Sequence, residues 1–231
     1  MSRTKKYNEK FKLLELNKFY SPSEAISLVK KMAVSNFNET FEAHFSLGID
    51  PRHADQQLRG TVQLPHGLGK EIRVAVVAQG EKLMQAKDSG ADEVGGDDLI
   101  EKIQKGWLDF DVLISTPDMM PKLGKLGKIL GAKGLMPNPK TGTVTLDIKT
   151  SIADFKSGKL EYRNDKFGVM HVQLGKVSFS ESQLLDHFIL FYDLFQRIKP
   201  SKSKGLYFKS ISLSSTMSPG VNVETVKTKW S

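Results

Sequence analysis

The chain has 231 residues, of which 39% are hydrophobic and 26% charged, as is typical of a folded globular protein with one large domain or two smaller ones. It contains no cysteine, which excludes disulfides and thiolate metal sites. No apolar stretch reaches the roughly 18 residues that a membrane span needs, so we expect no membrane partner.

The net charge of +8 favours a polyanionic binding partner, and the charge is distributed unevenly along the chain. Residues 1–67 hold 10 Lys and Arg against 7 Asp and Glu, and residues 159–231 hold 11 against 6. Residues 68–158 hold 13 of each kind. Two interpretations stay open: an ordinary solvated basic surface, or a polyanion-binding unit that both ends form together.

The N-terminal part predicts a helix followed by a one-sided strand. Ser21-Pro22-Ser23-Glu24 is a capping box with proline at the first helical position, and apolar residues follow it at helical spacing. Phe41–Leu47 then alternates apolar and polar residues. This alternation is typical of a strand with one face on a core and the other face wet or covered by something polar.

The middle of the chain has a different pattern. Ile72–Ala78 and Asp111–Ser115 are nearly continuous apolar runs, which indicate strands buried on both faces. Helices are predicted around Glu81–Ser89 and from Asp97 onward. Strands and helices that alternate in this way predict a parallel sheet with crossover helices.

The C-terminal part returns to the one-sided pattern. Leu160–Arg163 and Val169–Val172 flank Asn164–Gly168 and predict a hairpin. A second capping box, Ser180-Glu181-Ser182-Gln183, opens a long helix that ends before Pro200, and a last strand is predicted over Tyr207–Ser215.

Each end alone supplies too few elements for a core of its own. We therefore predict an α+β fold with an inserted α/β domain, in which residues 1–67 and 159–231 form one discontinuous domain and residues 68–158 form the insert. The chain would cross between them near Gly67–Gly69 and Ser157–Lys159, where glycines suit a hinge and an ordinary turn equally well.

The insert resembles nucleotide-binding folds, so a nucleotide-dependent enzyme is the alternative hypothesis. A phosphate loop needs Lys and Ser or Thr after its last glycine, but Glu71 follows Lys70 here. The first buried strand is followed by Gln79-Gly80-Glu81, which has one glycine and an acid where a dinucleotide fingerprint needs three glycines. The five histidines form no helical metal pair. We therefore expect no catalytic residue, cofactor, metal or small-molecule substrate.

The segment Lys122–Lys140 interleaves glycines with lysines and contains no acid. Two interpretations stay open for it: backbone N–H groups and ammonium ions laid against phosphates, or a flexible surface loop.

Several motifs, in this order and spacing, resemble the ribosomal protein L-one family of the large subunit in its bacterial and plastid form. They are Leu47-Gly48-Ile49-Asp50-Pro51-Arg52, Arg59-Gly60-Thr61-Val62, Leu64-Pro65-His66-Gly67, Gly106-Trp107-Leu108-Asp109-Phe110-Asp111, Thr116-Pro117-Asp118, Gly134-Leu135-Met136-Pro137-Asn138-Pro139-Lys140, Lys199-Pro200 and Ser214-Ser215-Thr216-Met217.

The resemblance covers residues 5 to 223, nearly the whole chain. It implies a discontinuous RNA-binding domain made of both termini and a Rossmann-like domain between them. It also implies a non-catalytic protein that binds large-subunit rRNA as the mobile stalk and assists release of deacylated tRNA at the exit site. Bacterial members of the family also bind a similar structure on their own mRNA and repress its translation. The implied location is the ribosome of a bacterial cytoplasm or a plastid stroma.

By the same resemblance, RNA contacts fall on Phe37, Thr40 and Glu42 and on Ser210, Thr216, Met217 and Ser218. Hydroxyls and a carboxylate suit the 2′-OH and base edges, and the two apolar side chains suit sugars. Phosphate contacts would then come from Arg52, Arg59, Arg163, Lys166 and Lys209.

The chain departs from the family pattern at two positions. Asn36 replaces a lysine, so one phosphate contact is expected to be lost. Ser218 replaces a glycine, which costs affinity if that glycine lets the backbone approach RNA closely or adopts a positive φ.

Overall fold

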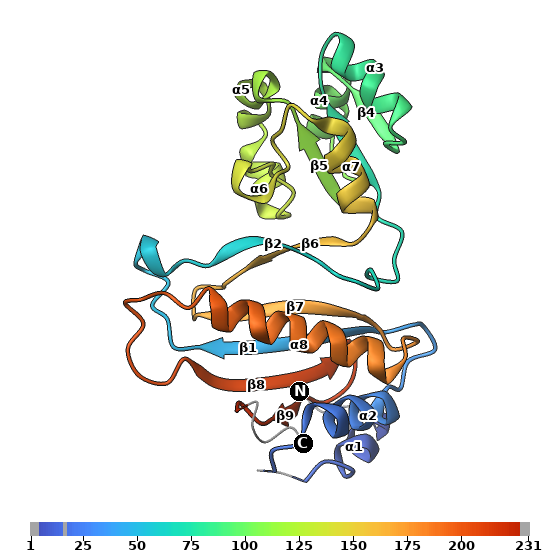
Figure 1. Cartoon of the computed structure of the whole chain (residues 1–231). Coiled ribbons are helices and arrows are strands. Elements are labelled where there is room, and N and C mark those ends of the chain that lie inside the picture. The colour runs from blue at the N-terminus through green and yellow to red at the C-terminus, as the bar shows by residue number, and fades with distance from the viewer. Residues whose placement is uncertain (1–4, 16–17, 227–231) are drawn as a thin grey trace. The chain divides into compact units, whose positions relative to one another are not determined.

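The computed structural model describes residues 5–15 and 18–226. The fold is mixed α/β with several sheets, one of them parallel (Figure 1). The chain forms two compact units, residues 1–59 with 162–231 (unit 1) and residues 60–161 (unit 2). The boundaries fall inside β2 (Arg59–Gln63) and β6 (Lys159–Arg163), which pair with each other.

Unit 1 is built on an antiparallel sheet in the order β7-β1-β8-β9. Its elements are α1 (Lys5–Phe11), α2 (Pro22–Met32), β1 (Thr40–Leu47), the 3-10 helix η1 (Ala54–Gln56), β7 (Val169–Lys176), α8 (Glu181–Arg197), β8 (Phe208–Ser215) and β9 (Val221–Val223).

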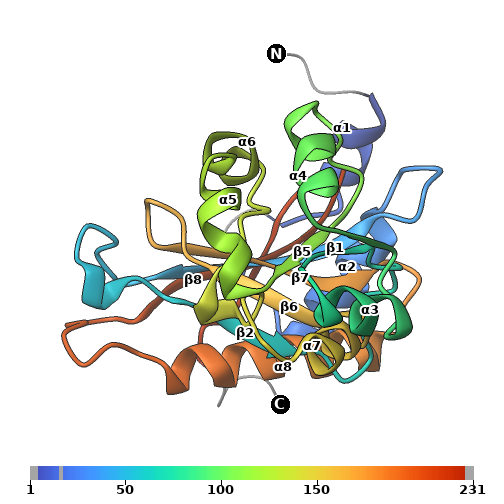
Figure 2. The same ribbon diagram turned by 90° about the horizontal axis from the view of Figure 1, so that it is seen from above.

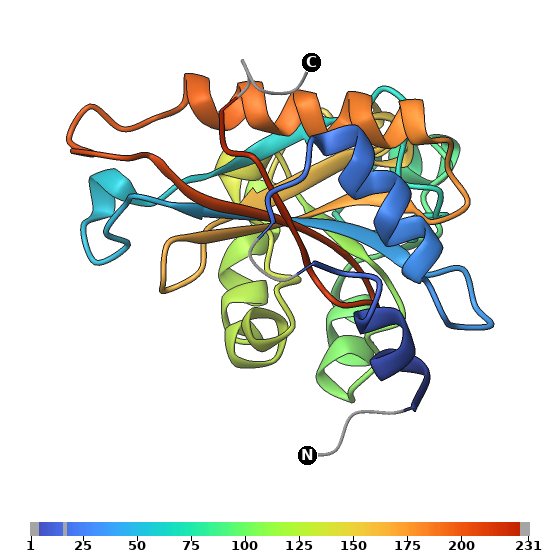
Figure 3. The ribbon, with the colours of Figure 1, turned by 90° about the horizontal axis from the view of Figure 1, so that it is seen from below.

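Both helices that cover this sheet begin as the sequence predicts. Ser21 and Ser180 each accept a backbone N–H of the first turn, and Glu24 and Gln183 accept the N–H of the capping serine in return. The two capping boxes are therefore confirmed. In Figure 3, α2 and α8 lie across the same face of the sheet.

The alternation of β1 gives the sheet two different faces. Phe41, Ala43, Phe45 and Leu47 are buried against α2 and α8, and Phe45 contacts the rings of Phe188 and Phe195. The other face, called the polar face below, is half-exposed or exposed. It carries Thr40, Glu42, His44 and Ser46 of β1, His171 and Gln173 of β7, and Ser210, Ser212 and Ser214 of β8.

The predicted hairpin around Asn164–Gly168 is wrong. Its two strands belong to different sheets, because β6 pairs with β2 and β7 pairs with β1. A tight turn joins them, in which Gly168 N–H donates to Asp165 O, and one isolated bridge links Asn164 to Met170.

Unit 2 has a parallel sheet in the order β4-β3-β5 with helices on both faces (Figure 2). Its elements are β3 (Val74–Val77), α3 (Glu81–Asp88), β4 (Glu93–Gly95), α4 (Asp97–Gln104), β5 (Val112–Ser115), η2 (Pro117–Met119), α5 (Met120–Gly124), α6 (Gly127–Ala132), η3 (Pro139–Thr141) and α7 (Ile148–Lys156).

The side chains of β3 point alternately into two cores. Ala75 and Val77 pack with α4, α5 and α6, whereas Val74 and Val76 pack with α3 and α7. All four are fully buried, which explains the continuous apolar run in the sequence.

We predict that Gly158→Ala destabilises unit 2. Gly158 has a φ of 107°, and a Cβ atom there would lie 2.7 Å from the Gly67 Cα. Strain of this kind costs about 1–3 kcal/mol. Chemical denaturation should show the loss. Gly131→Ala is the matched control, because it lies in α6 with open space around it and should be neutral or stabilising by up to about 1 kcal/mol. Equal stability of the two variants would contradict the prediction.

Candidate nucleic-acid interface

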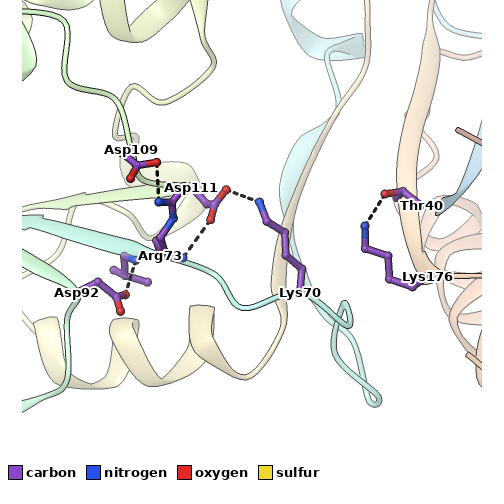
Figure 4. A network of polar contacts seen from close by, with 8 residues as sticks. Thr40, Lys70, Arg73, Asp92, Asp109, Asp111 and Lys176 are labelled. Carbon is purple, nitrogen blue, oxygen red and sulfur yellow. Dashed lines mark hydrogen bonds and ion pairs between the residues drawn. The ribbon is translucent and has the colours of Figure 1, made fainter. Parts of the chain in front are cut away.

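One end of the sheet gathers polar groups from three neighbouring segments of unit 1. Thr216 N–H donates to Thr40 O at 3.1 Å, and Thr40 N–H donates to Thr216 Oγ1 at 3.0 Å. The Lys176 ammonium of β7 donates to the Thr40 hydroxyl at 2.9 Å (Figure 4). The start of β1, the end of β7 and the loop after β8 therefore form one polar edge.

Two large apolar side chains stand exposed on the segments that form this edge. Phe37 is 57% exposed and Met217 is 53% exposed. Neither side chain therefore belongs to the core. Apolar side chains of this size, held in water next to hydroxyl groups, provide surfaces on which sugars and bases can pack.

A buried carboxylate holds the loops that carry Phe37 and Met217. Glu39 is 1% exposed. Its Oε1 accepts the N–H groups of Val34 and Ser35, at 3.0 and 2.8 Å. Its Oε2 accepts the Met217 N–H at 3.0 Å and the Ser215 hydroxyl. One side chain thus ties the loop before β1 to the loop after β8.

Burial alone would raise the pKa of Glu39, but the hydrogen bonds from Ser215, Ser35 and Met217 outweigh it and hold the pKa below its usual value. Sequence analysis missed this residue. Glu39 precedes the alternating strand, and no local pattern shows that an acid there meets donors from residue 215 onward.

Ser218, one of the two departures from the family pattern, closes the turn after β8. Its hydroxyl accepts the Ser215 N–H at 2.8 Å, and its own N–H donates to Ser215 O at 3.2 Å. A glycine could not supply the first of these bonds. The other departure, Asn36, lies exposed in the loop before Glu39.

The structure does not bring all the predicted contacts to one place. Ser210 lies opposite Ser46, six residues along β1 from Thr40, which corresponds to about 20 Å. The predicted phosphate contacts lie on β8, on β2 and β6, and in the loop and turn that join these strands to the sheet: Lys209, Arg59, Arg163, Arg52 and Lys166. The polar face runs from Thr40 to Ser210.

Two histidines occupy the middle of the polar face. The Nδ1 atoms of His44 and His171 lie 2.9 Å apart, and His44 Nε2 lies 3.1 Å from the Ser214 hydroxyl. Both rings are therefore hydrogen-bonded. His187 is also hydrogen-bonded, but it is buried under the other face, where its Nδ1 contacts Leu174 O.

In unit 2, many charges compensate one another. Arg73 pairs with Asp109, and Lys70 pairs with Asp111 (Figure 4). The hydrogen bonds from Lys70 and from Arg73 N–H outweigh burial and hold the pKa of Asp111 below its usual value. Unit 2 as a whole has 14 Lys and Arg and 14 Asp and Glu.

The segment Lys122–Lys140 contains two short helices, so the interpretation as a flexible loop is wrong. Leu123, Leu126 and Leu130 are buried in the core of unit 2, and the lysines between them face outward. Lys122 is paired with Asp97 at 2.6 Å.

Other classes of site find no support in the residues described. The helix after β3 begins at Glu81, which places a carboxylate where a nucleotide phosphate would bind. Within residues 5–15 and 18–226, no cluster of His, Asp and Glu could hold a metal ion. Over the same residues, no helix is both long and apolar enough to span a membrane.

We predict that Glu39→Gln lowers the stability of unit 1 by about 1–3 kcal/mol, because the amide NH2 would face hydrogen-bond donors. The pKa of Glu39 is lowered by folding, so its contribution is present above the unfolded-state value and lost as pH falls through the folded-state value. The difference in unfolding free energy between the wild type and Glu39→Gln should therefore shrink as the pH is lowered. Glu42→Gln, half-exposed on the polar face, is the control and should change stability by under about 0.5 kcal/mol. Equal costs for the two variants would contradict the role of Glu39.

A comparison with protein families agrees with the motifs. The model of the ribosomal protein L1p/L10e family matches residues 29–219, which span both units and include the polar edge. Proteins of this family are generally not enzymes. The chain therefore belongs to the ribosomal protein L1p/L10e family, and it is an rRNA-binding protein of the large ribosomal subunit.

Proposed function

We propose that the domain formed by residues 1–67 and 159–231 binds a structured region of large-subunit rRNA and forms the mobile stalk near the tRNA exit site. The stalk then assists release of deacylated tRNA, on a ribosome of a bacterial cytoplasm or a plastid stroma. The same surface would bind a similarly folded leader of the protein's own mRNA and repress translation.

The observation that carries this proposal is the edge around Thr40 and Thr216, with Phe37 and Met217 exposed on its loops. Hydroxyl groups can donate hydrogen bonds to the 2′-OH groups and base edges of structured RNA, or accept hydrogen bonds from them. Glu39 fixes both loops before RNA arrives, so little conformational entropy remains to be lost on binding.

Charge supports the same assignment. Unit 1 has 20 Lys and Arg against 12 Asp and Glu, so it carries the whole net charge of +8, and unit 2 carries none. This surplus of positive charge on unit 1 attracts the phosphate backbone of RNA. Binding should depend strongly on salt concentration, because neutralised phosphates release their counterions.

We predict that Met217→Ala weakens binding to the stalk rRNA fragment by about 1–3 kcal/mol, as measured by calorimetry. Thr216→Ala should cost a similar amount. Met84→Ala is the matched control, because Met84 is also exposed, at 71%, but lies on α3 of unit 2. Equal losses of RNA affinity for the Met217 and Met84 substitutions would contradict the assignment of Met217 as an RNA contact.

We also predict that residues 1–67 joined to 159–231 by a short linker bind the same fragment nearly as well as the whole chain, because they carry the surplus charge and the polar edge. Circular dichroism checks that the shortened protein folds. Comparing the rRNA fragment with the mRNA leader separates a ribosomal from a repressor role. If the shortened protein folds but loses most of its RNA binding, residues 1–67 and 159–231 are not sufficient for binding and the prediction is refuted.

A further inference from the structure

A row of polar groups crosses the middle of the polar face. His44 of β1 lies opposite His171 of β7, with their Nδ1 atoms 2.9 Å apart. His44 Nε2 lies 3.1 Å from the Ser214 hydroxyl, and His171 Nε2 lies 3.7 Å from Asp165 Oδ2. The row therefore runs from Ser214 through both histidines to Asp165.

The contact between the two Nδ1 atoms restricts where protons can lie. One of the two nitrogens must carry a hydrogen and the other must accept it. When both rings are neutral and Asp165 is ionised, His171 carries its hydrogen on Nε2, toward the carboxylate. His44 then carries its hydrogen on Nδ1, and its bare Nε2 accepts the Ser214 O–H.

Adding one proton reverses this row. A charged His171 forms an ion pair with Asp165 through Nε2 and donates a hydrogen bond from Nδ1 to His44. His44 stays neutral but now carries its hydrogen on Nε2, where it donates to the Ser214 oxygen. The Ser214 hydroxyl hydrogen is thereby released from the row and can be donated to a bound group on the polar face.

The surroundings disfavour a charge on His44. Burial, and then the charge of His171, lower the pKa of His44. Burial alone would raise the pKa of Asp165, but the N–H groups of Val169 and Phe167 keep it low, so the carboxylate stays ionised beside His171.

Other charged groups lie beside this row and beyond its ends. Glu42 of β1 lies directly opposite Ser214 in the register of β1 and β8, and Lys176 of β7 lies opposite Thr40. Lys209 precedes Ser210, which lies opposite Ser46, and Lys166 lies in the turn next to Asp165. The other residues of the polar face are neutral: Thr40, Ser46, Gln173, Ser210 and Ser212, with Asn222 of β9 opposite Ser212. The row thus sits between the polar edge and the cations of Lys166 and Lys209.

We infer that Ser214 is a further RNA contact, whose hydroxyl is switched by the His44–His171 pair from accepting to donating when the pair takes up a proton. The ligand class is a hydrogen-bond acceptor of RNA, either a phosphate oxygen or a base or sugar oxygen. The inference rests on the proposed RNA binding, because it assigns a partner to the polar face. Since the acceptor binds the donating state better, RNA binding and proton uptake favour each other.

The first test needs no RNA. Long-range proton–nitrogen NMR spectra of the histidine rings of the full chain are recorded from pH 8 to pH 5.5. We expect His44 to remain neutral while its hydrogen moves from Nδ1 to Nε2 in step with the charging of His171. A single tautomer of His44 over the whole range would overturn the switch, whatever the protein binds.

The second test measures affinity for the stalk rRNA fragment at pH 8 and pH 6. Wild type should bind more tightly at pH 6, by up to about tenfold if the complex raises the pKa of the pair by one unit. Ser214→Ala should lose most of this gain, although the histidine pair still charges. Ser212→Ala is the matched control on the same strand and should keep the gain.

The two experiments fail in different ways. An unchanged gain in Ser214→Ala would show that charge alone acts and would overturn the role of the hydroxyl. Absence of RNA binding by wild type at both pH values would overturn the proposed function, and with it the RNA contact at Ser214. The NMR result would still report the tautomers in that case.

Discussion

The register of β1 is the constraint on which the rest of unit 1 depends. Phe41 and Phe45 are fully buried beneath α2 and α8, so the strand cannot slip by one residue without moving these rings into water. The same register fixes Glu42, His44 and Ser46 on the opposite face. Packing of one face of β1 against the helices thus determines which polar side chains lie on the opposite face, where RNA is proposed to bind.

Glu39 extends this order from the strand to its loops. A carboxylate that accepts four hydrogen bonds in a buried site keeps the segments around Phe37 and Met217 in place. Exposed apolar side chains usually move, and RNA would have to order them. Here the backbone beneath them is already held, which lowers the entropic cost of recognition.

Much of the fold could be predicted from the sequence because the signals were local. The capping boxes at Ser21 and Ser180 and the alternation over Phe41–Leu47 depend on residues within one turn or one strand. The hairpin at Asn164–Gly168 was wrong because β6 pairs with β2 and β7 pairs with β1, and such distant partners leave no signal in the local sequence.

The candidate site was less predictable for the same reason. Ser210 and Thr216 are near each other in the sequence, but an extended strand separates them in space. Glu39 gave no local signal, since its donors come from 176 and 178 residues away as well as from its own loop. In Lys122–Lys140, frequent glycines concealed a buried leucine row at helical spacing.

The most direct test of the account is zero-length ultraviolet crosslinking of the chain to rRNA in intact large subunits, followed by mass spectrometry of the crosslinked peptides. The account predicts crosslinks in residues 36–42 and 214–218, from both ends of the chain and to the same stretch of rRNA. Crosslinks confined to residues 60–161, with none in these two segments, would contradict it.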